Sequence, residues 1–153
     1  MSASMTPTLM FANDQHGHAE AALELWISAF PNSSLGWINR WEEGAGEETP
    51  GTVMQAEAVI AGVPVRVMDS AHAHQFGFSP AHSYTVECDT EEEVDHAWST
   101  LTEGGQVLME LGEYPFSPKF GWCADRYGIN WQISVPMERG QDAEDRADSQ
   151  AHA

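Results

Sequence analysis

The chain has 153 residues and a formal net charge of −18, because 24 acidic residues face only six basic ones. This length fits one domain, and so negative a charge disfavours binding to nucleic acid or to an anionic membrane surface. With 42% hydrophobic residues and six tryptophans the chain can bury a core, which excludes global disorder. No apolar run approaches the roughly 20 residues of a spanning helix, and the N-terminus lacks a secretory pattern. We therefore expect a cytoplasmic protein.

The first half of the chain reads as a strand, a helix and three further strands. Apolar residues recur at helical spacing before Pro31, which cannot continue a helix. Two later runs of apolar and β-branched residues are separated only by Ala61-Gly62, which is typical of a tight hairpin. The predicted elements are a strand at 8–11, a helix at 19–30, and strands at 35–41, 52–60 and 63–69.

The second half repeats this order at a shift of roughly 70 residues. Thr90 and Glu93 form a capping box that predicts the start of a helix, and Gly104-Gly105 ends that helix. The predicted strands are at 82–88, 106–111, 119–123 and 130–135. The tail at 137–153 has almost nothing to bury, so we expect it to be disordered.

The two cysteines, Cys88 and Cys123, lie far apart and have no CxxC or CxxH partner. This spacing matches neither a disulfide framework nor a zinc finger. We expect two buried thiols.

The element order predicts an α+β fold with two tandem βαβββ modules, at 6–70 and 80–135, within a single domain at 6–135. Each module would form a curved, mixed four-stranded sheet with one helix on its convex side. Two such modules enclose a cleft.

Several segments are similar to the PhnB-like branch of the vicinal oxygen chelate superfamily, which also contains glyoxalases, bleomycin-resistance proteins and extradiol dioxygenases. The most specific match is Gly121-Trp122, followed by the segment 125–128 and by Trp131-Gln132. The other matching segments are TPTLMF, HAEAALELWISAFPNS and FSPAHSYTVECDTEEEVDHAW. The loops at 13–17 and 69–75 depart from the family pattern. The resemblance covers residues 6–135 and implies a glyoxalase-like fold that forms a homodimer.

In metal-dependent relatives, four ligands come from the first and last strands of each half. Mapped by motif, these positions lie near Pro7 or Thr8, and at Arg66, His82 and Gln132. Only His82 and Gln132 could bind a metal, because an arginine repels a divalent cation and proline offers no donor. The resemblance therefore implies a site without a metal or other cofactor.

The residues themselves favour four ligand-binding candidates, and three of them also occupy family positions. His82 is a general base or hydrogen-bond donor in a pocket, or else a core histidine. Gln132 should face the cleft, because Trp131 and Ile133 face the helix. Arg66 would select a carboxylate or phosphonate, or else pair with an acidic residue. Trp122 could stack on an aromatic ligand, or else belong to the core or the dimer interface.

These observations predict a protein that binds a small anionic or aromatic polar molecule in a metal-free cleft, with His82, Gln132 and Arg66 converging there. The alternative is a lyase, isomerase or dioxygenase-type enzyme of the same superfamily, with or without a metal. Members of this branch also carry a methyltransferase name linked to ubiquinone synthesis. The sequence does not favour that activity, because no glycine-rich loop joins a strand to a helix to hold a methyl donor.

Overall fold

The computed structural model describes residues 2–137, and most of the predicted disordered tail lies outside them. The first module consists of β1 (Thr8–Phe11), a short 3-10 turn (Asn13–Gln15), α1 (Ala19–Ala29), β2 (Ser34–Arg40), β3 (Val53–Ile60) and β4 (Val63–Asp69). The second consists of β5 (Ser83–Glu87), α2 (Glu91–Thr102), β6 (Gln106–Tyr114), β7 (Ser117–Ala124) and β8 (Asn130–Val135).

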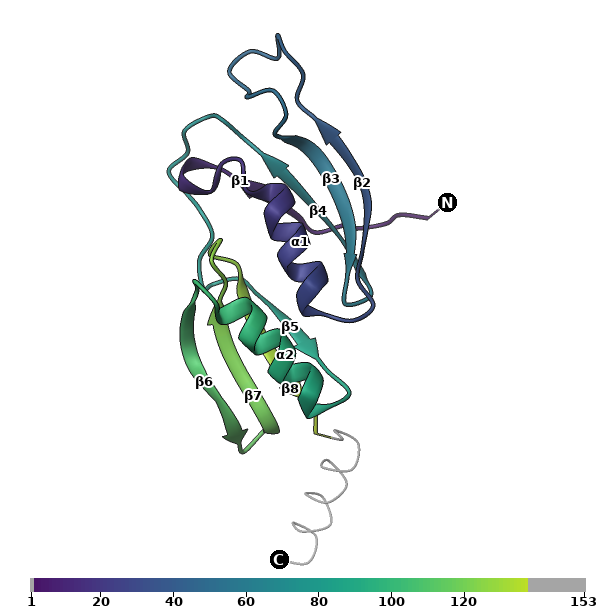
Figure 1. The fold of residues 1–153 in the computed structure, drawn as a ribbon, viewed down its shortest axis with the longest axis vertical. Helices are drawn as coiled ribbons and strands as arrows, with labels where there is room; N and C mark the ends of the chain where they lie inside the picture. Colours follow the sequence, from purple (N-terminus) through teal and green to yellow (C-terminus); the bar gives the residue numbers. More distant parts are fainter. Residues whose placement is uncertain (1, 138–153) are drawn as a thin grey trace, which may run out of the picture.

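Each module forms a mixed four-stranded sheet, in the order β1-β4-β3-β2 and β5-β8-β7-β6. The first and last strands of each module pair in parallel, and the other pairs are antiparallel. Figure 1 shows the two modules one above the other, with α1 and α2 on the same side of the sheets. The predicted α+β fold with duplicated βαβββ modules is confirmed.

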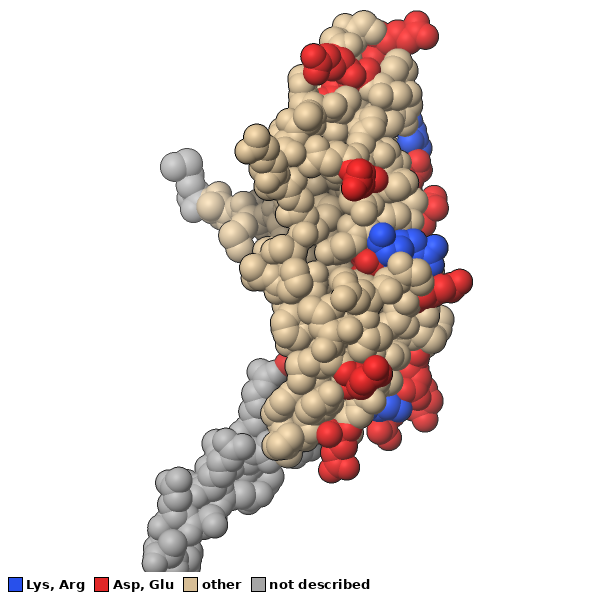
Figure 2. Space-filling model, turned by 90° about the vertical axis from the view of Figure 1, so that its left-hand side faces the viewer, with Lys and Arg blue, Asp and Glu red and all other residues tan. Residues whose placement is uncertain are grey.

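Strand alternation gives each sheet a side covered by a helix, the helix side, and an open side. On β4, Val65 and Val67 are buried on the helix side, so Arg66 between them lies on the open side. On β8, Trp131 is buried on the helix side, and Gln132 lies on the open side. Figure 2 is turned so that the helices lie to the right, and most Asp and Glu side chains in view gather there. The margin formed by the open side carries few charges.

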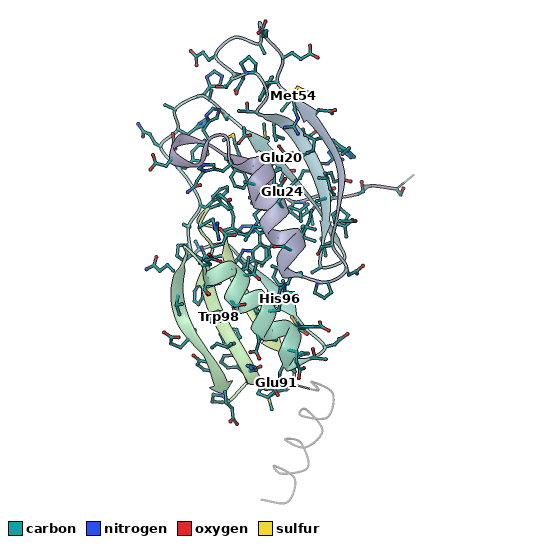
Figure 3. The ribbon with its side chains drawn as sticks, viewed as in Figure 1. Glu20, Glu24, Met54, Glu91, His96 and Trp98 are labelled. Carbon is teal, nitrogen blue, oxygen red and sulfur yellow. The ribbon has the colours of Figure 1, made fainter. Side chains whose placement is uncertain are left out.

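The two modules share one hydrophobic core, which runs from Phe11 in β1 to Ile133 in β8. The helices contact one another, and the imidazole Nε2 of His96 on α2 lies 2.8 Å from the carbonyl oxygen of Ser28 on α1. Figure 3 shows His96 on α2, where that helix approaches the end of α1, and Glu20 and Glu24 further along α1. In the second module, a Cβ at Gly121 on β7 would lie 2.5 Å from the ring of Trp98 on α2. Glycine is therefore required at this contact between α2 and β7.

A buried carboxylate joins the modules. Asp125 follows β7 and is only 3% exposed. Its Oδ2 accepts hydrogen bonds from the indole N–H groups of Trp26 on α1, at 2.8 Å, and of Trp131 on β8, at 2.9 Å. Its Oδ1 accepts from the backbone N–H groups of Tyr127 and Ile129. Burial raises the pKa of Asp125, and the four hydrogen bonds oppose that rise. This cluster ties the first helix to the second sheet.

The helix N-termini are capped by side chains. Asp69 at the end of β4 is 1% exposed, and its Oδ1 accepts from the backbone N–H groups of Gly17 and Ala19 at the start of α1. Its Oδ2 accepts from the N–H of Val53 on β3. At α2, the hydroxyl of Thr90 accepts from the N–H of Glu93, as the capping box predicts.

Both cysteines are buried and free, as expected. Burial raises the pKa of the Cys88 thiol to about 11 and that of Cys123 to about 12, so neither is a reactive nucleophile at neutral pH. Within residues 2–137, no helix is long and apolar enough to cross a membrane.

Replacing the joining carboxylate should destabilise the protein strongly. In Asp125→Asn an amide NH₂ group replaces Oδ2, so the two buried indole N–H donors lose their acceptor. We expect the free energy of unfolding to fall by about 3 kcal/mol. Trp26→Phe and Trp131→Phe each remove one donor and should cost less. The free energy of unfolding in urea measures these effects. The control Asp95→Asn removes a surface partner of Lys119 and should change stability by about 0.5 kcal/mol or less. Equal effects of Asp125→Asn and Asp95→Asn would contradict the role of Asp125.

Candidate functional site

The family's ligand positions lie on the open side, close to the first and last strands of each module. Strand register places Thr8 on β1 next to Arg66 on β4, and Thr85 on β5 next to Gln132 on β8. These pairs occupy equivalent places in the two modules. In this register Thr85, and not His82, lies next to Gln132.

Arg66 is half-buried and paired. Its Nε lies 2.8 Å from Oε1 of Glu57 on β3, and its guanidinium carbon lies 5.5 Å from the centre of the Trp37 ring on β2. Of the two alternatives given by the sequence for Arg66, the structure shows the pairing with an acidic residue. The two terminal guanidinium nitrogens have no hydrogen-bond partner among residues 2–137. They remain available to a ligand on the open side.

Gln132 and Trp122 lie together on the open side of the second sheet. Trp122 on β7 is opposite Gln132 on β8 in the strand register. The Gln132 amide donates to the hydroxyl of Ser83 at 2.9 Å, and the indole of Trp122 donates to the side-chain oxygen of Asn130 at 3.1 Å. Hydrogen bonds thus hold an amide and an indole in place on this surface.

His82 lies on the other side of the sheet. It precedes β5 and contacts the ring of Tyr84, with 5.1 Å between ring centres. Tyr84 in turn contacts Trp131, which is buried on the helix side. The expected convergence of His82 with Gln132 is therefore wrong, because strand alternation brings Ser83 to Gln132. The ligand-binding roles of Arg66, Gln132, Trp122 and His82 stay predictions.

The residues present on the open side do not fit the metal centre of metal-dependent relatives. The four equivalent positions supply two hydroxyls, one guanidinium and one amide, at Thr8, Thr85, Arg66 and Gln132. Divalent ions in proteins prefer carboxylate and imidazole ligands. Within the described part of the chain, no group of three or more His, Cys, Asp or Glu side chains could hold a metal ion.

Sequence reasoning missed the partners of Arg66. The bulge in β2 near Gly36 shifts the register between Leu35 and Trp37, and it brings Trp37 opposite Glu57. A Cβ at Gly36 would lie 2.8 Å from the Glu57 carbonyl oxygen, so only glycine fits there. A glycine within an alternating strand is the one sequence signal of that bulge.

Comparison with known proteins places the chain in a family. Residues 3–134 match the model of a family described as 3-demethylubiquinone-9 3-methyltransferase. The chain belongs to this family. A solved structure from Bacillus cereus, described as a putative 3-demethylubiquinone-9 3-methyltransferase, PhnB protein, is 41% identical with a TM-score of 0.80. That match covers 87% of this chain and 99% of the Bacillus chain. The predicted PhnB-like membership is confirmed.

More distant structures share the fold. Protein PA1353 from Pseudomonas aeruginosa is 21% identical with a TM-score of 0.74, over 88% of this chain and 98% of its own. The fosfomycin resistance protein FosX from Listeria monocytogenes, solved with Mn(II) and 1S,2S-dihydroxypropylphosphonic acid, is 13% identical with a TM-score of 0.59. That match covers 92% of this chain and 97% of FosX. No curated protein matches the chain. The fold is consistent with the vicinal oxygen chelate superfamily.

Proposed function

We propose that this protein binds a small molecule with a carboxylate or phosphonate group and a flat aromatic or polar part, on the open side of the sheets and without a metal ion. The observation that carries the proposal is the geometry of Arg66. Ion pairing with Glu57 uses its Nε, and the Trp37 ring supports the guanidinium, while both terminal nitrogens face no partner among the described residues.

A guanidinium in this state is suited to an anion with two oxygens. Its terminal nitrogens present parallel N–H donors that match a carboxylate or phosphonate. On the second module, the indole of Trp122 offers a flat apolar surface and the amide of Gln132 offers polar atoms beside it. We infer that the ligand's charged group lies at Arg66 and that its flat part packs beside the Trp37 ring, which already contacts the guanidinium. Trp122 and Gln132 belong to the other sheet and form a separate surface there.

Glu57 sets the strength of this interaction. The Arg66–Glu57 pair is neutral, so a ligand anion at Arg66 also meets the charge of Glu57 close by. The chain as a whole carries −18, which further opposes anion binding. The site would therefore retain an anion only when the flat part of the molecule adds contacts.

Binding is a better account than methyl transfer or metal-dependent catalysis. The β1–α1 connection has a single glycine, Gly17, and the β5–α2 connection has none, so neither forms a glycine-rich loop for a methyl donor. The open side lacks the carboxylate and imidazole donors of a catalytic divalent ion at the family positions. His82, the base that the sequence suggested, lies on the opposite side from Gln132.

We further propose a homodimer. Large apolar side chains remain exposed in the single chain: Leu35 at 51% and Trp37 at 38% on the edge strand β2, Val107 at 38% on the edge strand β6, and Val63 at 52% at the start of the inner strand β4. Of these side chains only Trp37 lies on the open side, opposite Glu57, whereas Leu35 and Val107 are opposite the buried Ala58 and Cys123 on the helix side. The margin of the open side carries few charges in Figure 2, so we propose that two copies meet on this side, around Trp37, despite their net charge.

Substitutions at the ion pair test the anion site. Isothermal titration with phenylphosphonate and with benzoate should show binding to the wild-type protein. Arg66→Leu should abolish it, while Glu57→Gln should strengthen it about tenfold, because it removes a competing charge. The control Arg40→Leu removes an exposed arginine that pairs with both carboxylate oxygens of Glu20, and it should leave binding unchanged. Weaker binding by Glu57→Gln, or unchanged binding by Arg66→Leu, would refute the proposal.

The oligomeric state is testable on its own. Sedimentation equilibrium in physiological salt at micromolar concentration should give the mass of two chains. The mass of two chains should persist at high salt. Salt screens the repulsion between the two negatively charged chains, and an uncharged interface has no ion pairs for salt to weaken. A single-chain mass under both conditions would exclude the homodimer.

A further inference from the structure

A pocket lies beside His82, away from the open side of the sheets. This space, the His82 pocket, has a volume of about 200 Å³. Its walls come from β1, the loop before β5, β5 itself, the β7–β8 turn and β8, and they include Leu9, Phe78, Ser79, His82, Tyr84 and Asn130. Arg66 does not line it. The pocket is therefore separate from the anion site at Arg66.

The sequence Ser79-Pro80-Ala81-His82 forms a turn that brings two polar side chains to this pocket. The backbone N–H of His82 donates to the carbonyl oxygen of Ser79 at 3.3 Å. Serine in the first position and proline in the second favour such a turn. The N–H of Ala81 donates to the Oγ of Ser79 at 3.2 Å. The Ser79 hydroxyl therefore keeps its own proton, which it donates to no other residue among 2–137.

The imidazole of His82 is held by packing and not by hydrogen bonds. Its ring meets the Tyr84 ring edge-on, with 5.1 Å between centres and 62° between planes. Tyr84 in turn packs against the buried Trp131. His82 is an exposed residue, and neither ring nitrogen has a hydrogen-bond partner in the described part of the chain. Both nitrogens are thus free to bond to a molecule in the pocket.

The other walls are mainly apolar and well supported. The ring of Phe78 meets the buried ring of Phe11 edge-on, with 5.1 Å between centres. Gly128 lies against Phe78, since a Cβ there would be 3.6 Å from the Phe78 Cβ. Leu9 and Tyr84 also line an apolar space between β1 and β5. A molecule in the His82 pocket would therefore meet polar groups at one end and apolar side chains at the other.

The charge of this pocket depends on His82 alone. None of the described residues that line it, from β1, the loop, β5, the β7–β8 turn or β8, is Asp, Glu, Lys or Arg. Tyr84 is the only other titratable residue among them, and burial raises its pKa, so it keeps its proton at neutral pH. Histidine is the side chain that changes its charge between about pH 5 and 8. Protonation of His82 therefore decides whether the pocket carries a positive charge.

We propose that the His82 pocket binds a small carboxylic acid as its anion and releases it when His82 loses its proton. The protonated imidazole and the Ser79 hydroxyl donate to the carboxylate, and a compact apolar group contacts Leu9 and Phe78. A hydrogen bond between charged partners is about twice as strong as a neutral one. The neutral pocket does not retain the anion, because the net charge of −18 repels it. The volume suits a short branched acid, since a cavity of about 150 Å³ accommodates benzene.

A matched pair of probes tests this site. 3-Methylbutanoate is a short branched carboxylate, and 3-methylbutanamide has the same shape without the charge. NMR titration of the full chain, followed at the histidine ring protons, should show saturable millimolar binding of the carboxylate at about pH 6, where the acid is ionised. Its affinity should fall about tenfold at about pH 8, because histidine is then neutral. The amide should bind weakly and equally at both pH values.

Two substitutions at His82 separate its charge from its hydrogen bonding. His82→Gln keeps an amide donor that cannot ionise, so the affinity for the carboxylate should be low at both pH values. His82→Lys stays positive up to about pH 8, so the affinity should be high at both. Ser79→Ala removes one donor and should weaken binding about threefold without changing the ratio between the two pH values.

Two control variants change residues outside the pocket. His96 on α2 contacts the Ser28 carbonyl oxygen, and His96→Gln should alter neither the affinity nor its pH dependence. Arg66→Leu should have no effect either. The guanidinium keeps its charge throughout this pH range, and 3-methylbutanoate has no flat part to pack beside Trp37. This result makes the test independent of the anion site.

Four results would overturn the proposal. One is the absence of saturable binding of 3-methylbutanoate by the wild-type protein at millimolar concentration and about pH 6. Another is equal affinity of the wild-type protein at the two pH values. The third is an unchanged pH dependence in His82→Gln or His82→Lys when circular dichroism shows that the variant is folded. The fourth is loss of binding in Arg66→Leu, because the carboxylate then binds at the anion site.

Discussion

The arrangement of the two modules depends on one buried carboxylate. Asp125 accepts the indole N–H groups of Trp26 and Trp131, and these two rings also contact one another at 5.6 Å between centres. An unpaired carboxylate at this depth would be costly, and so would two unpaired indoles. Each group therefore requires the other two. Because Trp26 belongs to the first module and the other two residues to the second, this requirement fixes how the modules meet.

That arrangement determines which side chains each side of the molecule presents. With both helices on one side, the open sides of both sheets face the other way, and they carry Arg66 and Gln132. The sheets are not continuous, so the seam between β1 and β5 is closed only by side chains. Leu9 and Tyr84 leave space on either side of themselves there. A polar surface on the open side and an apolar space at the seam thus arise from the same packing.

The fold was predictable from the sequence because its signals are local. The apolar spacing before Pro31, the hairpin at Ala61-Gly62 and the capping box at Thr90 each specify an element without reference to distant residues. The site was predicted only in part. The side of the sheet on which Gln132 and Arg66 lie followed from alternation, but His82 lies one residue outside β5 and on the other side. The pairing of Arg66 with Glu57 and Trp37 depends on a bulge between strands, which a single strand's pattern cannot reveal.

Native-state hydrogen exchange of the Trp26 and Trp131 indole protons tests most directly whether Asp125 makes one cooperative unit of the two modules. Exchange of both protons should require the same free energy as global unfolding in denaturant, because neither hydrogen bond can open while the shared core remains intact. Exchange of the Trp26 proton through a much smaller opening, with the sheets still protected, would contradict this account. The modules would then separate without unfolding, and the placement of both candidate sites would not depend on Asp125.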